Sequence, residues 1–219
     1  MEIDHIFICV KPEALEAEML KEFGLTEGTA NQHLGQGTAN RRFFFHNAFI
    51  ELLFLRDDTE LQSELTKATR LYERLTSKGK NTSPFGICLR PKTDNEKQEL
   101  FSSWAYRPMY LPKQLKIDIG HSPLHEPMWF FLHFASRPDK AKQEKQQPLR
   151  NPKGFREITS LHITIPNTEQ LSGPALCVRQ IKGVEIVEGD EHLLQIGFDN
   201  ERHAQSWDFR PTLPLVFRW

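Results

Sequence analysis

Two ionisable side chains in apolar, strand-like segments are the residues of this sequence best suited to chemistry. His5 lies in the apolar run Asp4–Val10. Glu51 lies in a second run, Phe49–Leu55. An ionisable group in such a run is costly to bury without a partner. A histidine and a glutamate on neighbouring strands form half of a metal site or an acid–base pair, so the residues around them decide which chemistry is open to this protein.

The overall composition is that of a globular protein without a strong electrostatic field. The chain has 219 residues, of which 38% are hydrophobic and 26% charged. This length exceeds a typical domain of about 100–150 residues, so one large domain or two fused modules both fit. The net charge of -1 provides no general attraction for nucleic acid or for an anionic membrane, and neither is expected as a partner.

The cysteines and the hydropathy pattern predict a cytoplasmic protein. No apolar run approaches the ~18 residues of a membrane-spanning helix, and no secretion signal is visible. Cys9, Cys88 and Cys177 lie far apart in apolar surroundings, which predicts buried free thiols in a reducing compartment. The absence of a CxxC motif excludes a zinc ribbon or a redox pair of that type.

The first unit, residues 1–56, has the predicted order β-α-β-β with room for one more short strand. A strand over 3–10 leads into a helix that ends at Gly24, where a glycine favours a helix C-terminus. A hairpin then joins strands over 41–46 and 49–55.

The second unit, residues 85–135, repeats the build of the first. The order apolar–Cys–apolar–basic–Pro occurs at 8–12 and again at 87–91. A helix predicted over 94–104 and a late apolar strand over 128–134 follow. The chain therefore contains an internal repeat of a βαβββ-like unit.

The remaining segments connect and extend these units. Apolar residues at helical spacing predict a connecting helix over 59–77. Residues 136–154 are charged, glutamine-rich and bounded by proline, which predicts an exposed linker. A third unit over 155–219 begins with the strand 158–165 and again has the predicted order β-α-β-β-β, packing on the first two.

Four segments together resemble the glyoxalase-like branch of the vicinal-oxygen-chelate superfamily, which includes glyoxalase I, extradiol dioxygenases and bleomycin-resistance proteins. They are DHIFICV, TANRRFFFHNAFIELLFL, FGICLRP and EPMWFFLHF. The resemblance covers residues 1–135 well and the third unit loosely. It implies an α+β fold in which repeated βαβββ modules form a curled, incompletely closed mixed-sheet barrel with helices on the outside. It also implies a cavity that holds the substrate and often a divalent metal.

The resemblance assigns metal ligands to the first and last strand of each module. His5 matches the first-strand position and Glu51 the last-strand position of unit one. In unit two the position of His5 falls on Pro84 or Gly86, and that of Glu51 falls around residues 130–131, which are phenylalanines. None of these side chains ligates a metal. Units one and two therefore supply two protein ligands, which make a weak site.

The third unit offers one way to complete the site. His162 repeats the histidine on a first strand, and with His5 and Glu51 it would form a two-histidine, one-carboxylate face suited to Zn²⁺, Ni²⁺, Mn²⁺ or Fe²⁺. This requires the first and third units to meet. The alternative, which the missing second pair favours, is a pocket without metal. There His5 and Glu51 act as an acid–base pair or simply bind each other.

Further residues are candidates for substrate contact. By the resemblance, the segment around Asn40 borders the cavity, so Asn40, Arg41 and Asn47 are candidate polar contacts. Trp129 belongs to the aromatic strands, whose alternate residues face opposite sides, and one set could line a cavity. The 16 phenylalanines favour a substantial apolar pocket.

Two main classes of function follow, with a third behind them. The first is a lyase, isomerase or dioxygenase-type enzyme that acts on a small oxygen-bearing molecule through His5 and Glu51. The second is a metal-free protein of the resistance type that binds a hydrophobic small molecule without chemistry. A structural interaction module is the third, and a cavity filled by side chains would favour it. The partner in the first two classes is a small molecule, and the chain is expected to be a monomer or a homodimer.

Overall fold

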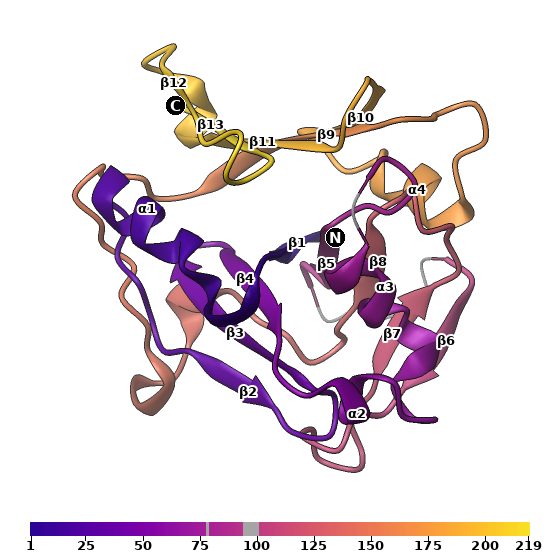
Figure 1. The fold of residues 1–219 in the computed structure, drawn as a ribbon. Helices are drawn as coiled ribbons and strands as arrows, with labels where there is room; N and C mark the ends of the chain where they lie inside the picture. The colour runs from indigo at the N-terminus through magenta and orange to yellow at the C-terminus, as the bar shows by residue number, and fades with distance from the viewer. Residues whose placement is uncertain (78, 94–100) are drawn as a thin grey trace.

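The computed structural model describes residues 1–77, 79–93 and 101–219, and two β-sheets make up most of it (Figure 1). The first sheet has eight strands in the order β2-β3-β4-β1-β5-β8-β7-β6, so β1 and β5 lie at its centre. Its strands are β1 (Glu2–Cys9), β2 (Asn31–His33), β3 (Thr38–Phe44), β4 (Phe49–Leu55), β5 (Phe85–Arg90), β6 (Ser103–Tyr106), β7 (Ile117–Gly120) and β8 (Met128–Phe131).

The eight-stranded sheet consists of two halves of matching strand order. In the first half β1 pairs in parallel with β4, and in the second half β5 pairs in parallel with β8. The halves meet where β1 and β5 pair antiparallel. Within the described residues β2 and β6 form the two edges, so the curled sheet does not close into a barrel. The predicted α+β fold with an incompletely closed mixed sheet is confirmed.

The central strands are apolar because both of their faces are covered. Along β1, Ile6 and Ile8 belong to one hydrophobic cluster and Phe7 to another. Residues that alternate along a strand face opposite sides of the sheet, so such a strand shows no polar face. Where the halves meet, Phe7 lies opposite Gly86, and a Cβ atom at Gly86 would come within 2.0 Å of the Phe7 ring. Glycine is therefore required at this crossing.

The helix α1 (Glu16–Phe23) crosses the first half of the sheet and buries Ala17 and Leu20. It ends at Gly24, whose left-handed φ of 112° lets its N–H bond to the last carbonyls of the helix. The predicted end of this helix at Gly24 is confirmed.

The segment over residues 59–77 is broken into short pieces, although its apolar spacing predicts one helix. It contains α2 (Asp58–Leu61), a 3₁₀ turn over Lys67–Thr69 and α3 (Leu71–Thr76). The Thr69 hydroxyl donates to the carbonyl of Thr66 and accepts from the N–H of Leu71. Such local side-chain bonds compete with a continuous helix.

The helix predicted over 94–104 falls mostly on residues 94–100, which lie outside the described residues. Its last two positions, Ser103 and Trp104, belong to strand β6.

The second sheet is built from the third unit and has a different strand order, β10-β9-β11-β13-β12. Its first strand, β9, lies between β10 and β11, whereas β1 in the first sheet lies between β4 and β5. The helix α4 (Gly173–Val178) connects β9 to β10, and Ser172 caps it. The strands are β9 (Ile158–Ile165), β10 (Val184–Glu188), β11 (Leu193–Phe198), β12 (Ser206–Asp208) and β13 (Leu215–Arg218).

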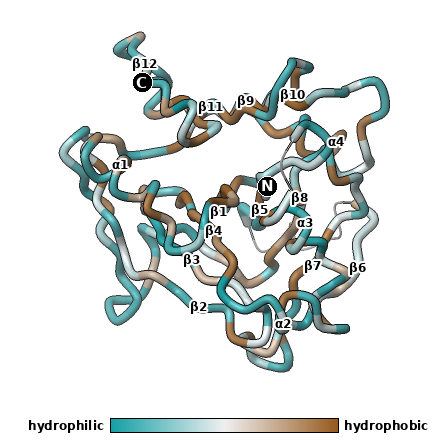
Figure 2. Tube along the Cα trace, viewed as in Figure 1, coloured by the Kyte–Doolittle hydropathy of each residue, from teal (hydrophilic) through white to brown (hydrophobic). Residues whose placement is uncertain are grey.

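The two faces of the first sheet have different neighbours. One face packs with α1 and the second sheet into a single large hydrophobic cluster, which includes Ile6, Leu52 and Trp129 of the first sheet and Leu161 and Ile163 of β9. The other face holds a smaller cluster, which includes Phe7, Leu53, Tyr106, Met128 and Phe130. In Figure 2 the most hydrophobic stretches follow these central strands, while hydrophilic stretches follow the outer loops.

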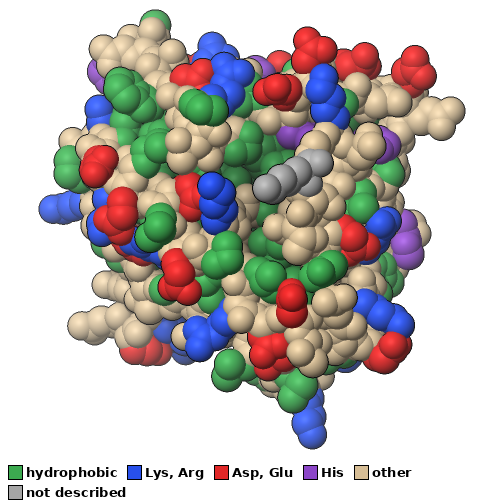
Figure 3. All heavy atoms as spheres, in the orientation of Figure 1, with side chains coloured by type: hydrophobic (Ala, Val, Ile, Leu, Met, Phe, Trp, Pro, Cys, Tyr) green, Lys and Arg blue, Asp and Glu red, His purple; other side chains and the backbone are tan. Residues whose placement is uncertain are grey.

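The surface carries charges of both signs. On the face drawn in Figure 3, basic and acidic side chains are interspersed with hydrophobic ones. In the described part of the chain, no helix combines the length and apolar character needed to cross a membrane.

Candidate functional site

A small cavity opens on the face of the first sheet that points away from the second sheet. Its volume is about 80 Å³. The first half of the sheet contributes His5, Phe7 and Glu51, and the second half contributes Met128 and Phe130. Because both halves line it, the cavity forms only where the two modules meet.

His5 and Glu51 face each other at this cavity. The Nε2 atom of His5 lies 3.7 Å from Oε2 of Glu51, and the two residues are only 8% and 5% exposed. The His5 ring stacks on Phe49 at 4.4 Å between centroids and meets the edge of Phe130 at 5.3 Å. Asn40 donates from Nδ2 to Oε1 of Glu51 at 2.7 Å. One carboxylate oxygen is thus anchored, and the other points toward the imidazole.

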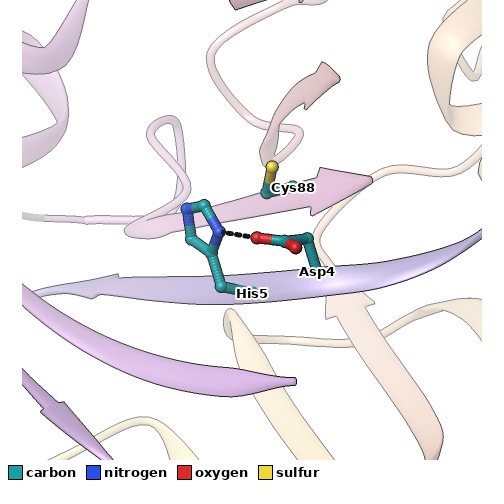
Figure 4. A group of neighbouring side chains, drawn as sticks. All are labelled: Asp4, His5 and Cys88. Carbon is teal, nitrogen blue, oxygen red and sulfur yellow. Dashed lines mark hydrogen bonds and ion pairs between the residues drawn. The ribbon is translucent and has the colours of Figure 1, made fainter. Parts of the chain in front are cut away.

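Asp4 and Arg90 hold the far side of the imidazole. Oδ1 of Asp4 lies 2.7 Å from Nδ1 of His5, as Figure 4 shows, and its Oδ2 accepts from Nη1 of Arg90 at 3.0 Å. Arg90 is 1% exposed and also donates to Glu2 and to the carbonyl of Asn47. A carboxylate on one ring nitrogen fixes the orientation of a histidine and leaves the other nitrogen for the cavity.

A β-bulge explains how adjacent residues of one strand share this site. Ile3 pairs with Leu89 and His5 pairs with Cys88, so Asp4 is an extra residue on β1. A bulge bends the strand and re-aims its side chains. The Asp4 carboxylate therefore reaches the ring of His5 instead of pointing directly to the opposite face.

A second polar group lies at the opposite wall of the cavity. His33, Gln36 and Tyr110 all line it. Nδ1 of His33 lies 2.9 Å from the hydroxyl of Thr38, and the His33 ring packs on Tyr110 at 4.8 Å. Burial lowers the pKa of His33 and raises that of Tyr110 well above its usual value. Both groups are therefore kept neutral near pH 7.

Of the four residues predicted to contact substrate, the structure brings only Asn40 to the His5–Glu51 pair. Arg41 lies next to it on β3 but faces the other side, where Nε donates to Glu27 at 2.6 Å. Trp129 is fully buried in the large cluster and donates from Nε1 to Glu126.

Asn47 makes a connection between the two sheets. Its Nδ2 donates to the carbonyl of Ile158 at 2.7 Å, and its Oδ1 accepts from the N–H of the same residue at 2.9 Å. This pair of bonds ties the β3–β4 turn to the first residue of β9.

The structure does not bring His162 to His5 and Glu51. On β9, Leu161 and Ile163 face the first sheet within the large cluster, so His162 between them faces away from it. Its Nδ1 lies 3.1 Å from Oε2 of Glu185 on β10. The cavity, moreover, opens on the opposite face of the first sheet.

The strand register identifies the counterparts of His5 and Glu51 in the second half. The repeat that aligns residues 8–12 with 87–91 places Pro84 at the position of His5. In the first half, Glu51 pairs with Phe7. The same repeat makes Gly86 the counterpart of Phe7, and Gly86 pairs with Met128 in the second half. The counterpart of Glu51 is therefore Met128, not the phenylalanines at 130–131 that the sequence suggests. The second half contributes neither an imidazole nor a carboxylate at these positions.

Among the described residues, one group of three could hold a metal ion by proximity. The ligand atoms of Asp4, His5 and Cys88 lie within 4.8 Å of one another, and all three residues are buried (Figure 4). Their chemistry fits a metal poorly. The guanidinium of Arg90 already neutralises Asp4, and burial raises the pKa of the Cys88 thiol well above its usual value. Asp4 would have to be a free carboxylate and Cys88 a thiolate to bind a metal beside His5, so the set suits hydrogen bonding better.

Several residues of the site gave little signal in the sequence. Asp4 is adjacent to His5, but an ideal strand would point the two side chains apart, and nothing in the sequence marks the bulge. Arg90 stands where Lys11 stands in the first unit, yet Lys11 is exposed. His33 and Tyr110 lie in short or irregular segments whose place in the fold depends on tertiary packing.

Comparisons with known proteins agree with this architecture. A structure described as a hypothetical protein from Staphylococcus aureus aligns with a TM-score of 0.53 at 13% identity, over 99% of this chain and 98% of that chain. A "xylose isomerase-like TIM barrel/4-hydroxyphenylpyruvate dioxygenase fusion protein" aligns with a TM-score of 0.52 at 13% identity. That alignment covers 92% of this chain and 38% of the fusion protein. At this identity, the likeness concerns the fold alone.

The sequence itself gives the family. No curated protein matches it. A family model described as a glyoxalase-like domain matches residues 3–174, which include the start of the second sheet and all of the eight-stranded sheet except Glu2. The chain therefore belongs to the glyoxalase-like domain family of the vicinal-oxygen-chelate superfamily.

Proposed function

We propose that this protein binds a small oxygen-bearing organic molecule in the cavity and moves a proton on it through Glu51 and His5. Membership of the glyoxalase-like family supports binding or catalysis on a small molecule in general terms. The specific proposal rests on the geometry of the two side chains.

The observation that carries the proposal is the 3.7 Å separation between Oε2 of Glu51 and Nε2 of His5. This is wider than a direct hydrogen bond of about 2.7–3.2 Å, so both atoms are available to a third group. Their far sides are occupied by Asn40 and Asp4 respectively. A pair held in this way presents two proton-transfer atoms to one ligand.

The chemistry that fits is removal of a proton from a carbon beside a carbonyl group. Oε2 of Glu51 accepts the proton, and the electron pair left on carbon moves into the carbonyl as an enolate. This step requires a proton on both ring nitrogens of His5, so that Nδ1–H donates to Asp4 and Nε2–H donates to the enolate oxygen. Return of the proton to the same or a neighbouring atom completes an exchange or an isomerisation. The apolar walls made by Phe7, Met128 and Phe130 strengthen these interactions by excluding water.

A deuterium-exchange experiment tests this function before the natural substrate is known. The protein is incubated in D₂O with a panel of small ketones and hydroxy ketones, and label next to the carbonyl is followed by NMR. We expect exchange above the buffer rate for at least one compound, and a loss of at least ~100-fold in Glu51→Gln, since a positioned general base contributes about 10²–10⁴.

The chain provides a matched control in the His162–Glu185 pair on the second sheet. Glu185→Gln removes the carboxylate of an exposed histidine–glutamate pair and should exchange label like the wild type. Equal exchange in the wild type and Glu51→Gln would rule out Glu51 as the base.

Binding without chemistry is the second candidate, and one observation favours it. Pro84 and Met128 stand at the positions equivalent to His5 and Glu51, so the second half of the sheet lines the cavity without a histidine or a carboxylate. A ligand that binds in the cavity without exchange of its hydrogens would establish this alternative.

We also place the protein in the cytoplasm as a monomer or a homodimer. No disulfide joins any two of Cys9, Cys88 and Cys177, which supports a reducing compartment. The net charge of -1 supports a small-molecule partner over nucleic acid.

A further inference from the structure

The cavity beside His5 and Glu51 is too small for most organic ligands. Its volume of about 80 Å³ corresponds to roughly three water molecules at ~30 Å³ each. Pockets that enclose a drug-sized ligand are typically about 300–1,000 Å³. A carbonyl head with its immediate neighbours fits this space, and the rest of a larger ligand has to lie elsewhere.

A much larger groove begins at Tyr110. It has a volume of about 1020 Å³, and its walls come from the β2–β3 turn, the segment between α2 and α3, and the loop after β6. Three of its lining residues are large, exposed hydrophobics: Leu34 is 64%, Leu65 40% and Met109 75% exposed. Exposed apolar side chains gathered around one groove are typical of a binding surface.

Tyr110 lines both the cavity and the groove. Its ring packs on His33 inside the cavity, and its hydroxyl donates to Oε1 of Gln36 at 3.3 Å. Gly35, the neighbour of Gln36 in sequence, lines the groove. The two spaces thus adjoin at Tyr110, and a ligand that reaches from the groove into the cavity has to pass beside this side chain.

The charges of the groove restrict what it can hold. None of its lining residues is Lys or Arg. Of its two acids, Glu60 accepts from the N–H groups of Gly35 and Gly37, and Glu64 pairs with Lys67. The lining of the groove therefore offers no cation for an anionic group, and its polar side chains other than the two acids, Asn31, Gln32 and Ser63, are neutral.

From these observations we infer that the ligand is elongated, with a carbonyl head in the cavity and an uncharged apolar tail in the groove of Leu34, Leu65 and Met109. The inference rests on the proposed function for the head and adds the tail. The groove supplies the apolar contact area that the small cavity lacks, so burial of the tail raises the affinity for the ligand.

Methyl ketones of increasing length, from 2-butanone to 2-decanone, test this arrangement by NMR titration of the wild-type protein. The affinity should rise about fourfold for each methylene added once the chain passes Tyr110. Burial of a CH₂ group contributes ~0.8 kcal/mol, and ~1.4 kcal/mol corresponds to a tenfold change in affinity. In the variant Leu34→Ser/Met109→Ser the rise should fall below about twofold per methylene, while 2-butanone binds as before. Leu15→Ser, at a leucine that is 72% exposed and does not line the groove, is the matched control and should follow the wild type.

The outcomes separate the two proposals. If 2-butanone binds but the affinity stays flat along the series, or rises equally in the groove variant, the groove holds no tail and the inference is overturned while the head site stands. If no member binds and no ketone exchanges its hydrogens, the head site itself is refuted, and the inference fails with it.

Discussion

Glu51 and His5 are each fixed from behind and left open toward each other. Asn40 holds Oε1 of Glu51 at 2.7 Å, Asp4 holds Nδ1 of His5 at 2.7 Å, and the facing atoms are 3.7 Å apart. Side chains fixed in this manner are held in position before a ligand arrives, which favours proton transfer to or from that ligand.

The role of Asn40 can be measured by the variant Asn40→Ala. It leaves Oε1 of Glu51 buried without a donor, so we expect the free energy of unfolding to fall by about 1–3 kcal/mol. Ketone deuterium exchange should fall by about tenfold because the carboxylate is no longer held in position. Urea unfolding and NMR exchange give the two values. Unchanged exchange would show that Glu51 needs no support from Asn40.

The buried Arg90–Asp4 pair should dominate the stability of the site. Arg90→Ala leaves Asp4 buried and unpaired apart from His5, and removal of one partner of a buried pair costs about 3–5 kcal/mol. Arg210→Ala breaks an exposed pair with Asp208 and should cost far less than Arg90→Ala. Urea denaturation compares the two variants. Equal losses of unfolding free energy in the two variants would mean that the buried Arg90–Asp4 pair stabilises the fold no more than the exposed pair does.

Asn47→Ala should loosen the second sheet from the first. The variant removes both hydrogen bonds to the backbone of Ile158, which leads to an expected loss of about 1–3 kcal/mol and faster amide exchange in β9. Binding of short ketones should not change, because Asn47 lies outside the cavity. Asn167→Ala, which removes an exposed local bond to Glu169, serves as control. A loss of ketone binding in Asn47→Ala would instead place this side chain at the ligand.

Metal loading is expected to be weak. After equilibration with Zn²⁺, Ni²⁺, Mn²⁺ or Fe²⁺ and removal of free ions, elemental analysis of untagged protein should find well below one ion per chain. The reason is that Arg90 competes for Asp4 and the Cys88 thiol remains protonated. A stoichiometric ion that is lost in His5→Ala would overturn this expectation.

The protein should lose stability in mild acid through His33. Burial lowers its pKa in the folded state, so below the usual value of about 6.5 the unfolded chain takes up a proton that the folded chain does not. The free energy of unfolding therefore falls as the pH drops from about 7 toward 5, by up to ~1.4 kcal/mol per pH unit from this residue. His33→Gln should reduce this slope, and the exposed His203→Gln should not. Identical slopes in all three proteins would exclude His33 as the cause.

The repeat made the architecture of the first sheet predictable. The pattern at 8–12 and 87–91 placed β1 and β5 in equivalent positions, and these strands became the two central ones. The faces of the strands were not predictable in the same way. A strand such as β8, buried on both sides, has no polar alternation that tells Trp129 from Phe130, so only the register reveals which of them meets the cavity.

The site itself was predictable only in its two central residues. His5 and Glu51 stand out because each is ionisable in an apolar run. Asp4 and Arg90 do not, because their roles depend on a bulge and on the pairing of strands about 85 residues apart in sequence. His33 depends on how a three-residue strand packs against Tyr110.

The register that makes Met128 the counterpart of Glu51 has a stereochemical consequence. The strand pairing is similar in the two halves on either side of the β1–β5 crossing, but Glu51, the proposed base, stands on one side only. A flat carbonyl compound that binds between the two halves in one orientation therefore turns only one of its faces toward Glu51. Of the two enantiotopic hydrogens on a prochiral methylene, only one is within reach, so deuterium introduced by this protein would carry a single handedness.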